Sequence, residues 1–209
     1  QSMFSHLRQT IVARCKSSAS RLRQMSTATP STPGLELGEY SGGMKLFHFA
    51  TGGSILVCVG LVNLAQYQKG KKKMETMYYH KSFGLLAAGL MVPRLFIRLT
   101  SKIPNPIPGP MWEVMAAHAT HAALYGFMIF MPISGIVMGY YGGKGLPFFW
   151  TTVPGAEKAD GAIAKKAFEN HKLIGHYAQY LIPMHVGAVG FHFFIKGRNI
   201  LPRIFPFGK

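Results

Sequence analysis

The sequence predicts an all-α membrane protein, built as a four-helix transmembrane bundle. Of its 209 residues, 48% are hydrophobic and only 14% are charged, and the hydrophobic residues come in long runs. An apolar run of about 20 residues can span a bilayer as a helix. The four segments that meet this criterion are 46–67, 77–99, 112–141 and 173–195.

The net charge of +16 does not indicate a nucleic-acid-binding protein. The basic residues lie at the N-terminus and in short segments between the apolar runs, where membrane proteins carry their flanking charges. Of the two cysteines, Cys15 lies in the basic N-terminal region and Cys58 in an apolar run. They imply no disulfide framework, and the sequence has no C-x-x-C-H motif for covalent haem attachment.

Residues 1–45 read as a basic leader followed by a flexible connector. The first acidic residue is Glu36, and before it come several arginines and serines with scattered apolar residues, which is typical of a mitochondrial or plastid transit peptide. The stretch 23–26, Arg-Gln-Met-Ser, resembles a mitochondrial processing site. The alternative is a disordered basic tail. We expect residues 46–209 to form the membrane domain.

The connections between the apolar segments have clear roles. The lysine run at 69–73 predicts a solvated turn, and the proline-rich stretch 103–110 predicts a stiff connector. Residues 142–150 predict an interfacial loop anchored by aromatic residues, and residues 162–169 are consistent with a short amphipathic helix. Pro93 predicts a kink, whereas Pro183 is tolerable in a packed bundle. No strand pattern or repeat is evident.

The fourth segment carries histidines at a spacing that suggests metal ligands. His171 and His185 are fourteen positions apart, which returns them to nearly the same helix face, roughly 21 Å apart along the axis. Ionisable residues inside a membrane are costly and usually functional. Each ring could therefore ligate a redox metal near a different membrane surface. His176 lies off this face and is expected to be structural.

Alternating helices predict which histidines meet. We call the side of the membrane at which the first helix begins side A, and the opposite side, side B. His48 then lies near side A and is expected to pair with His185. His80 lies near side B and is expected to pair with His171. His192, seven positions after His185, is the alternative partner for His48.

Two arginines and two further histidines are expected near side A. Arg94 is fourteen positions after His80, and Arg98 follows one turn later. Either could pair with a haem propionate, or extend to a lipid phosphate. His118 and His121 could line a quinone pocket or form hydrogen bonds within the bundle.

Paired neutral imidazoles, without a thiolate or carboxylate partner, favour six-coordinate haem iron over zinc. Ligation by two histidines leaves no open position on the iron. The predicted activity is therefore electron transfer rather than oxygen activation.

Together, these residues resemble the bacterial-type cytochrome b561 family of di-haem membrane proteins. The resemblance covers residues 45–206. The matching motifs are L-F-H-F at 46–49, Y-H-K-S-F-G at 79–84, R-L-F-I-R-L at 94–99, A-H-A-T-H at 117–121, P-I-S-G-I-V-M at 132–138 and K-G-R at 196–198, with His171 and His185 at the family's spacing.

The resemblance implies two b-type haems, membrane electron transfer and a quinone or quinol partner. Two features depart from the family: the transit-like leader, and Asn170 where members commonly have an aromatic residue. The leader suggests the mitochondrial inner membrane, with a plastid membrane as the alternative. Lysines and arginines are spread over both sides, so the positive-inside rule does not set the orientation. Import of the N-terminus favours side A as the matrix side.

Three functional classes fit the chain to different degrees. The first is an electron carrier or quinone-linked oxidoreductase subunit. The second is an accessory or scaffold subunit of a respiratory-chain complex that retains haem for structure. A channel or transporter is disfavoured, because no inverted repeat and no acidic relay are visible. Membrane lipid surrounds the bundle in all three cases.

Overall fold

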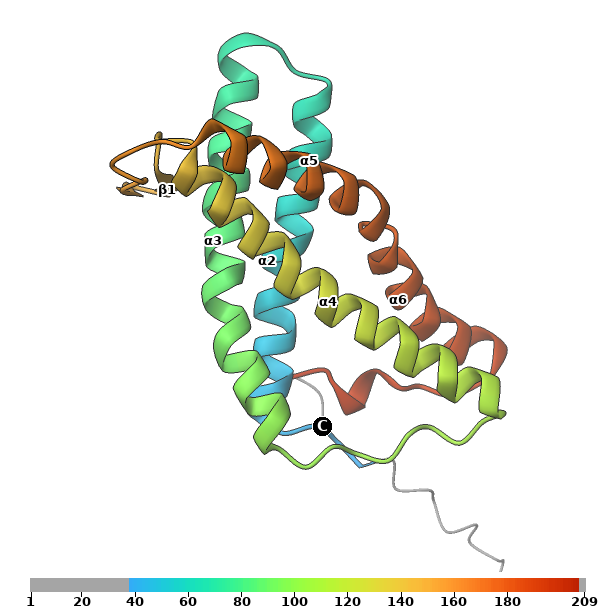
Figure 1. Ribbon diagram of the computed structural model, residues 1–209. Coiled ribbons are helices and arrows are strands. Elements are labelled where there is room, and N and C mark those ends of the chain that lie inside the picture. The colour runs from blue at the N-terminus through green and yellow to red at the C-terminus, as the bar shows by residue number, and fades with distance from the viewer. Residues whose placement is uncertain (1–37, 207–209) are drawn as a thin grey trace, which may run out of the picture. The chain divides into compact units, whose positions relative to one another are not determined.

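The computed structural model describes residues 38–206, so the predicted leader and its processing site lie outside the described residues. Most of this range is helical (Figure 1). In chain order the elements are α2 (Gly42–Gln66), α3 (Gly70–Thr100), α4 (Met111–Tyr141), β1 (Leu146–Phe148), β2 (Thr151–Val153), α5 (Gly161–Ala178), α6 (Leu181–Gly190), the π-helix η1 (Phe191–Ile195) and the 3₁₀ helix η2 (Leu201–Arg203).

The predicted four-helix membrane architecture is confirmed, with one difference in the fourth span. Helices α2, α3 and α4 are each long and apolar enough to cross a membrane. The fourth span is formed by α5 and α6 in succession, not by one unbroken helix over 173–195. Pro183 accounts for the break, because proline lacks the N–H that would bond to the carbonyl of Gln179. The N–H of Ile182 bonds to that carbonyl instead, at 3.2 Å.

The short amphipathic helix expected at 162–169 is the first part of α5. Asp160 begins this helix, because its Oδ1 accepts from the backbone N–H groups of Ala162 and Ile163, both at 3.0 Å. An aspartate at this position satisfies N–H groups that have no partner within the helix. The helix of the fourth span therefore begins well before the apolar segment, at Gly161.

The helices form two hairpins. α2 packs along α3, and α4 packs along α5 and continues against α6. The second hairpin is close-packed because glycines face its inner side: a Cβ on Gly175 would come within 2.9 Å of Met131 Cε, and one on Gly135 within 3.4 Å of His171 Cε1. Small residues allow this close approach in membrane helices.

The interfacial loop expected at 142–150 contains a short antiparallel β-hairpin, which the sequence did not predict. Leu146 pairs with Val153, and Phe148 with Thr151. Phe149 at the turn has a φ of 47°, an unusual conformation for a residue with a side chain. Helix α3 holds it there: its N–H donates to Ser82 Oγ at 3.0 Å, and its carbonyl accepts from the Tyr78 hydroxyl at 2.7 Å. Trp150 is exposed, as an interfacial anchor would be.

On side A, one buried arginine connects the two ends of the described chain to the proline-rich connector. Arg203 donates from Nε to the carbonyl of Gly38 and from Nη2 to that of Asn105, while its own carbonyl accepts from the N–H of Tyr40. In Figure 1 these three segments lie together at the end of the bundle where α2 begins. The start of α2 is therefore fixed from both sides.

We expect Ser82→Ala to loosen the β-hairpin. Ser82 is fully buried, and its hydroxyl accepts from the N–H of Phe149. Leaving a buried N–H without a partner costs about 1–3 kcal/mol. The measurement is thermal unfolding in detergent combined with limited proteolysis at 146–153. Thr151→Ala, at an exposed position of the same hairpin, is the control; equal effects of the two substitutions would contradict this role for Ser82.

Candidate haem-binding site

The two histidines predicted for side B face each other. His80 of α3 and His171 of α5 have ring centroids 6.3 Å apart and nearly perpendicular planes. Each ring is held through Nδ1: that of His80 lies 2.9 Å from the carbonyl oxygen of Cys58, and that of His171 lies 2.9 Å from Ser134 Oγ. Since a carbonyl can only accept, His80 Nδ1 carries the proton and its Nε2 keeps a free lone pair.

The two histidines predicted for side A also face each other. His48 of α2 and His185 of α6 have ring centroids 6.1 Å apart. A third ring, that of His121 on α4, lies edge-on to His185 with centroids 5.4 Å apart. His121 was expected near side A, and the structure places it against this pair.

Arg94 lies beside the side A pair. Its Nη2 is 3.1 Å from Nδ1 of His48, and its guanidinium lies over the ring of Tyr125, 6.0 Å from the centroid. Its Nε is buried and has no hydrogen-bond partner. Arg98, one turn further along α3, interacts electrostatically with His121. A cluster of positive charge therefore lies at this end of the bundle.

The two pairs have the ring separation that a bis-histidine haem requires. An imidazole nitrogen binds a metal at about 2.0–2.1 Å, so two rings on opposite sides of one iron have centroids about 6 Å apart. Both pairs match this separation. Each pair also takes one ring from the α2/α3 hairpin and one from the second hairpin.

The surroundings of the pairs also suit a flat macrocycle. Over residues 38–206, no group of three or more His, Cys, Asp or Glu side chains converges as a metal site. Each facing pair would provide two imidazole ligands. A porphyrin supplies the other four. A Cβ built on Gly52, one turn after His48, or on Gly126 of α4 would meet nothing within 4 Å. The residues present therefore fit haem.

The two sites lie at different depths. Ten residues of α2 separate His48 from Cys58, which contacts His80, so the sites are roughly 15 Å apart along that helix. A bound haem would supply a one-electron couple at each position. The histidines would ligate it, and Arg94 and Arg98 are placed to neutralise propionates on side A.

The remaining predicted residues lie outside the two pairs. His192 lies in the π-helix η1, with a buried Nδ1 that has no hydrogen-bond partner. His118 is exposed on α4. His176 is exposed and packs edge-on against Tyr177 and Tyr180.

Cys58 and Ser134 are site residues that the sequence analysis did not identify. Cys58 contacts His80 twice, since its carbonyl accepts from the ring and its Sγ–H donates to the His80 carbonyl at 3.3 Å. Ser134 contacts His171. A serine or cysteine in an apolar helix is ordinary, so only the approach of the neighbouring helix could reveal these contacts.

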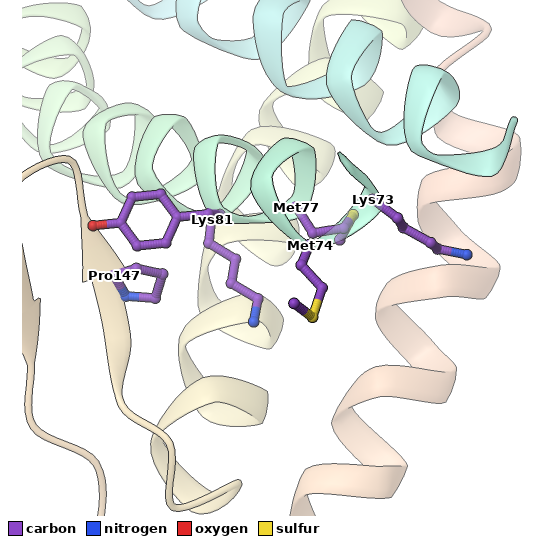
Figure 2. A pocket seen from close by; sticks show the side chains of 6 residues that line it. Lys73, Met74, Met77, Lys81 and Pro147 are labelled. Atoms are coloured by element: carbon purple, nitrogen blue, oxygen red, sulfur yellow. The ribbon is translucent and has the colours of Figure 1, made fainter. Parts of the chain in front are cut away.

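A basic recess opens near the start of α3, the helix that carries His80. It has a volume of about 420 Å³ and lies between the first turns of α3 and strand β1 (Figure 2). Two lysines, Lys73 and Lys81, line it together with apolar atoms of Met74 and Met77. Lys81 directly follows His80. An anion drawn to these lysines would therefore bind on the same helix as His80.

Comparisons with known proteins point to one family. The family described as prokaryotic cytochrome b561 matches residues 39–207. Among curated proteins, cytochrome b561 homolog 1 of Escherichia coli is 30% identical over 128 residues, covering 61% of this chain and 73% of that protein. The probable superoxide oxidase CybB of Yersinia pestis matches with the same identity and coverage. Cytochrome b561 homolog 2 of E. coli is 32% identical over 147 residues, covering 69% of this chain and 77% of its own.

The family match spans most of the chain, including all four spans and every histidine of the two pairs. Membrane electron transfer and b-type haem accompany this membership. The chain therefore belongs to the prokaryotic cytochrome b561 family of membrane cytochromes.

Proposed function

We propose that this protein carries electrons across a membrane through two bis-histidine b-type haems and exchanges them with quinone or quinol on side A. The observation that carries the proposal is the pair of imidazole couples, with centroids 6.1 and 6.3 Å apart, that join the two helical hairpins. His48 and His185 would ligate one haem, and His80 and His171 the other. Because both irons would be saturated, the haems pass electrons and do not bind oxygen.

Side A is the better candidate for the quinone site. Four chemically suitable groups gather there, namely Arg94, Arg98, His118 and His121. Arg94 and Arg98 would pair with propionates. His121 lies against His185, so a quinone hydrogen-bonded to His121 would approach the side A haem closely. His118, one turn earlier on α4, could take the second quinone oxygen.

The proposed setting is the mitochondrial inner membrane, and the support for it is the basic, acid-free sequence before Glu36.

A respiratory complex is the natural partner in that membrane. The chain could then serve as an accessory subunit with structural haem. Purification from its native membrane distinguishes the two roles: a free cytochrome reducible by quinol supports the carrier, and fixed stoichiometry with a complex supports the subunit.

We expect a reduced-minus-oxidised visible spectrum of the purified protein to show about two non-covalent b-type haems per chain, both six-coordinate. His171→Ala should remove the side B haem and leave the side A haem, halving the haem content. His80→Ala should give the same result, because it removes the other ligand of that iron. Retention of both haems after either change would show that the side B pairing is wrong.

A second comparison decides between His185 and His192 as the side A ligand. We expect His185→Ala to remove the side A haem, since the ring of His185 faces that of His48. His192→Ala is the matched control, on the same stretch of chain, and should leave the haem content unchanged. The reverse result would make His192 the ligand. Haem content per chain is the measurement in both cases.

A second candidate activity is superoxide oxidation, favoured by the basic recess at Lys73 and Lys81 and by similarity to the probable superoxide oxidase of Yersinia pestis. Each superoxide would lose one electron and leave as O₂. Two such electrons and two protons would convert one quinone to quinol. Lysines beside the side B site would attract the anion and raise its encounter rate.

We expect superoxide to reduce the haems rapidly at low ionic strength, and salt to slow this reduction. Lys73→Gln with Lys81→Gln should lower the rate several-fold, because two charges are removed from the recess. Lys165→Gln with Lys166→Gln removes the same charge from exposed positions of α5 and is the control. Stopped-flow absorbance measures the rate. Equal rates in both double variants would argue against entry at the recess.

A further inference from the structure

The two histidine pairs differ in what contacts their Nδ1 atoms. On side B, both rings face oxygen atoms of the protein: the Cys58 carbonyl and the Ser134 hydroxyl. On side A, His48 faces the guanidinium of Arg94. Imidazole chemistry makes this difference important, because a ring that binds a metal through Nε2 must carry its proton on Nδ1.

The hydrogen bonds of Ser134 define the state of His171. Ser134 Oγ lies 2.8 Å from the carbonyl oxygen of Phe130 and 3.0 Å from that of Met131. Both carbonyls are acceptors, so the single hydroxyl proton must point toward them. The hydroxyl oxygen then accepts from Nδ1–H of His171. This leaves Nε2 of His171 with a free lone pair, facing His80.

The packing around His171 keeps this contact in place. Ser134 is buried, and the next residue, Gly135, lies against the ring, so that a Cβ there would come within 3.4 Å of Cε1. The ring therefore rests directly on α4.

Side A has the opposite arrangement. A guanidinium has only donors, so the contact with Arg94 requires His48 Nδ1 to accept and places the proton on Nε2. For His48 to ligate through Nε2, the proton must move to Nδ1 and Arg94 must turn to another partner. The positive charge of Arg94 would nevertheless remain beside the site.

We infer that Ser134 is a positioning residue that holds His171 in its metal-binding tautomer, and that the side B haem consequently has the lower reduction potential of the two. The inference rests on the proposed function, since it assumes that both pairs bind haem. An acceptor on Nδ1–H makes imidazole a stronger electron donor and stabilises ferric iron. A nearby cation stabilises the less positive ferrous state. With haem bound at both positions, an electron would therefore pass spontaneously from side B to side A, oxidising the first iron and reducing the second.

The test is a spectroelectrochemical titration of the full chain with both haems bound. Wild type should titrate in two steps, and the step at lower potential should be the one lost in His171→Ala. Ser134→Ala should shift that lower step upward and leave the upper step in place. Ser134→Cys, whose sulfur is a weak acceptor, should give a smaller upward shift.

Ser54→Ala is the matched control. Ser54 is also buried, and its hydroxyl donates to the carbonyl of Ala50 in its own helix, so its loss should move neither step. The ferric EPR spectrum gives a second measurement: Ser134→Ala should change one of two low-spin signals and leave the other unchanged. A structural role alone would move stability but not one potential selectively.

Each outcome decides the inference. Unchanged potentials in a fully loaded Ser134→Ala variant, or a lower step that survives His171→Ala, would overturn it. Loss of the side B haem from Ser134→Ala, with retention at a raised potential in Ser134→Cys, would support it. A wild-type chain that binds no haem would overturn the proposed function instead, so the two failures are distinguishable.

Discussion

The arrangement of this bundle depends on the meeting of imidazole rings across two helical hairpins. α2 packs along α3 and α4 along α5, whereas the contacts between the two hairpins are sparser. Each histidine pair takes one ring from each hairpin. Burying a polar group at membrane depth costs free energy unless the group has a partner. Imidazole nitrogens that face each other without a shared ligand would therefore destabilise the bundle. A haem between each pair would satisfy them and join the hairpins at two depths.

Much of this arrangement could be predicted from the spacing of a few residues. Fourteen positions separate His171 from His185, and the same number separates His80 from Arg94, so each pair of positions falls on one helix face. Alternating spans then determine which ring approaches which. The structure brings together the predicted couples, even though the fourth span is broken at Tyr180. The break does not disturb the pattern, because the chain continues in nearly the same helical sense across only two residues.

Other features could not be predicted, for physical reasons. The hairpin at 146–153 depends on α3, because Ser82 and Tyr78 hold Phe149 in a conformation that its own sequence disfavours. The contact between Ser134 and His171 depends on how closely α4 approaches α5. Gly135 and Gly175 make this close approach possible, but glycines in an apolar helix do not by themselves predict it. The break before Pro183 was not predicted either, because Pro93 and Pro132 lie inside helices that stay unbroken. The length of a helix and the residues that share one of its faces can be read from the local sequence. The contacts between two helices depend on how the whole bundle packs.

The distribution of acidic residues limits how charge can cross this bundle. Among the described residues, the only carboxylates in α2, α3 and α4 are Glu75 and Glu113, each near the start of its helix. Glu113 pairs with Lys196 at 2.6 Å on side A. No carboxylate in these three helices lies between the two histidine sites to relay a proton. A quinone reduced on side A, as we propose, would therefore take its protons from the surface on that side, where Glu113, His118 and His121 lie on α4.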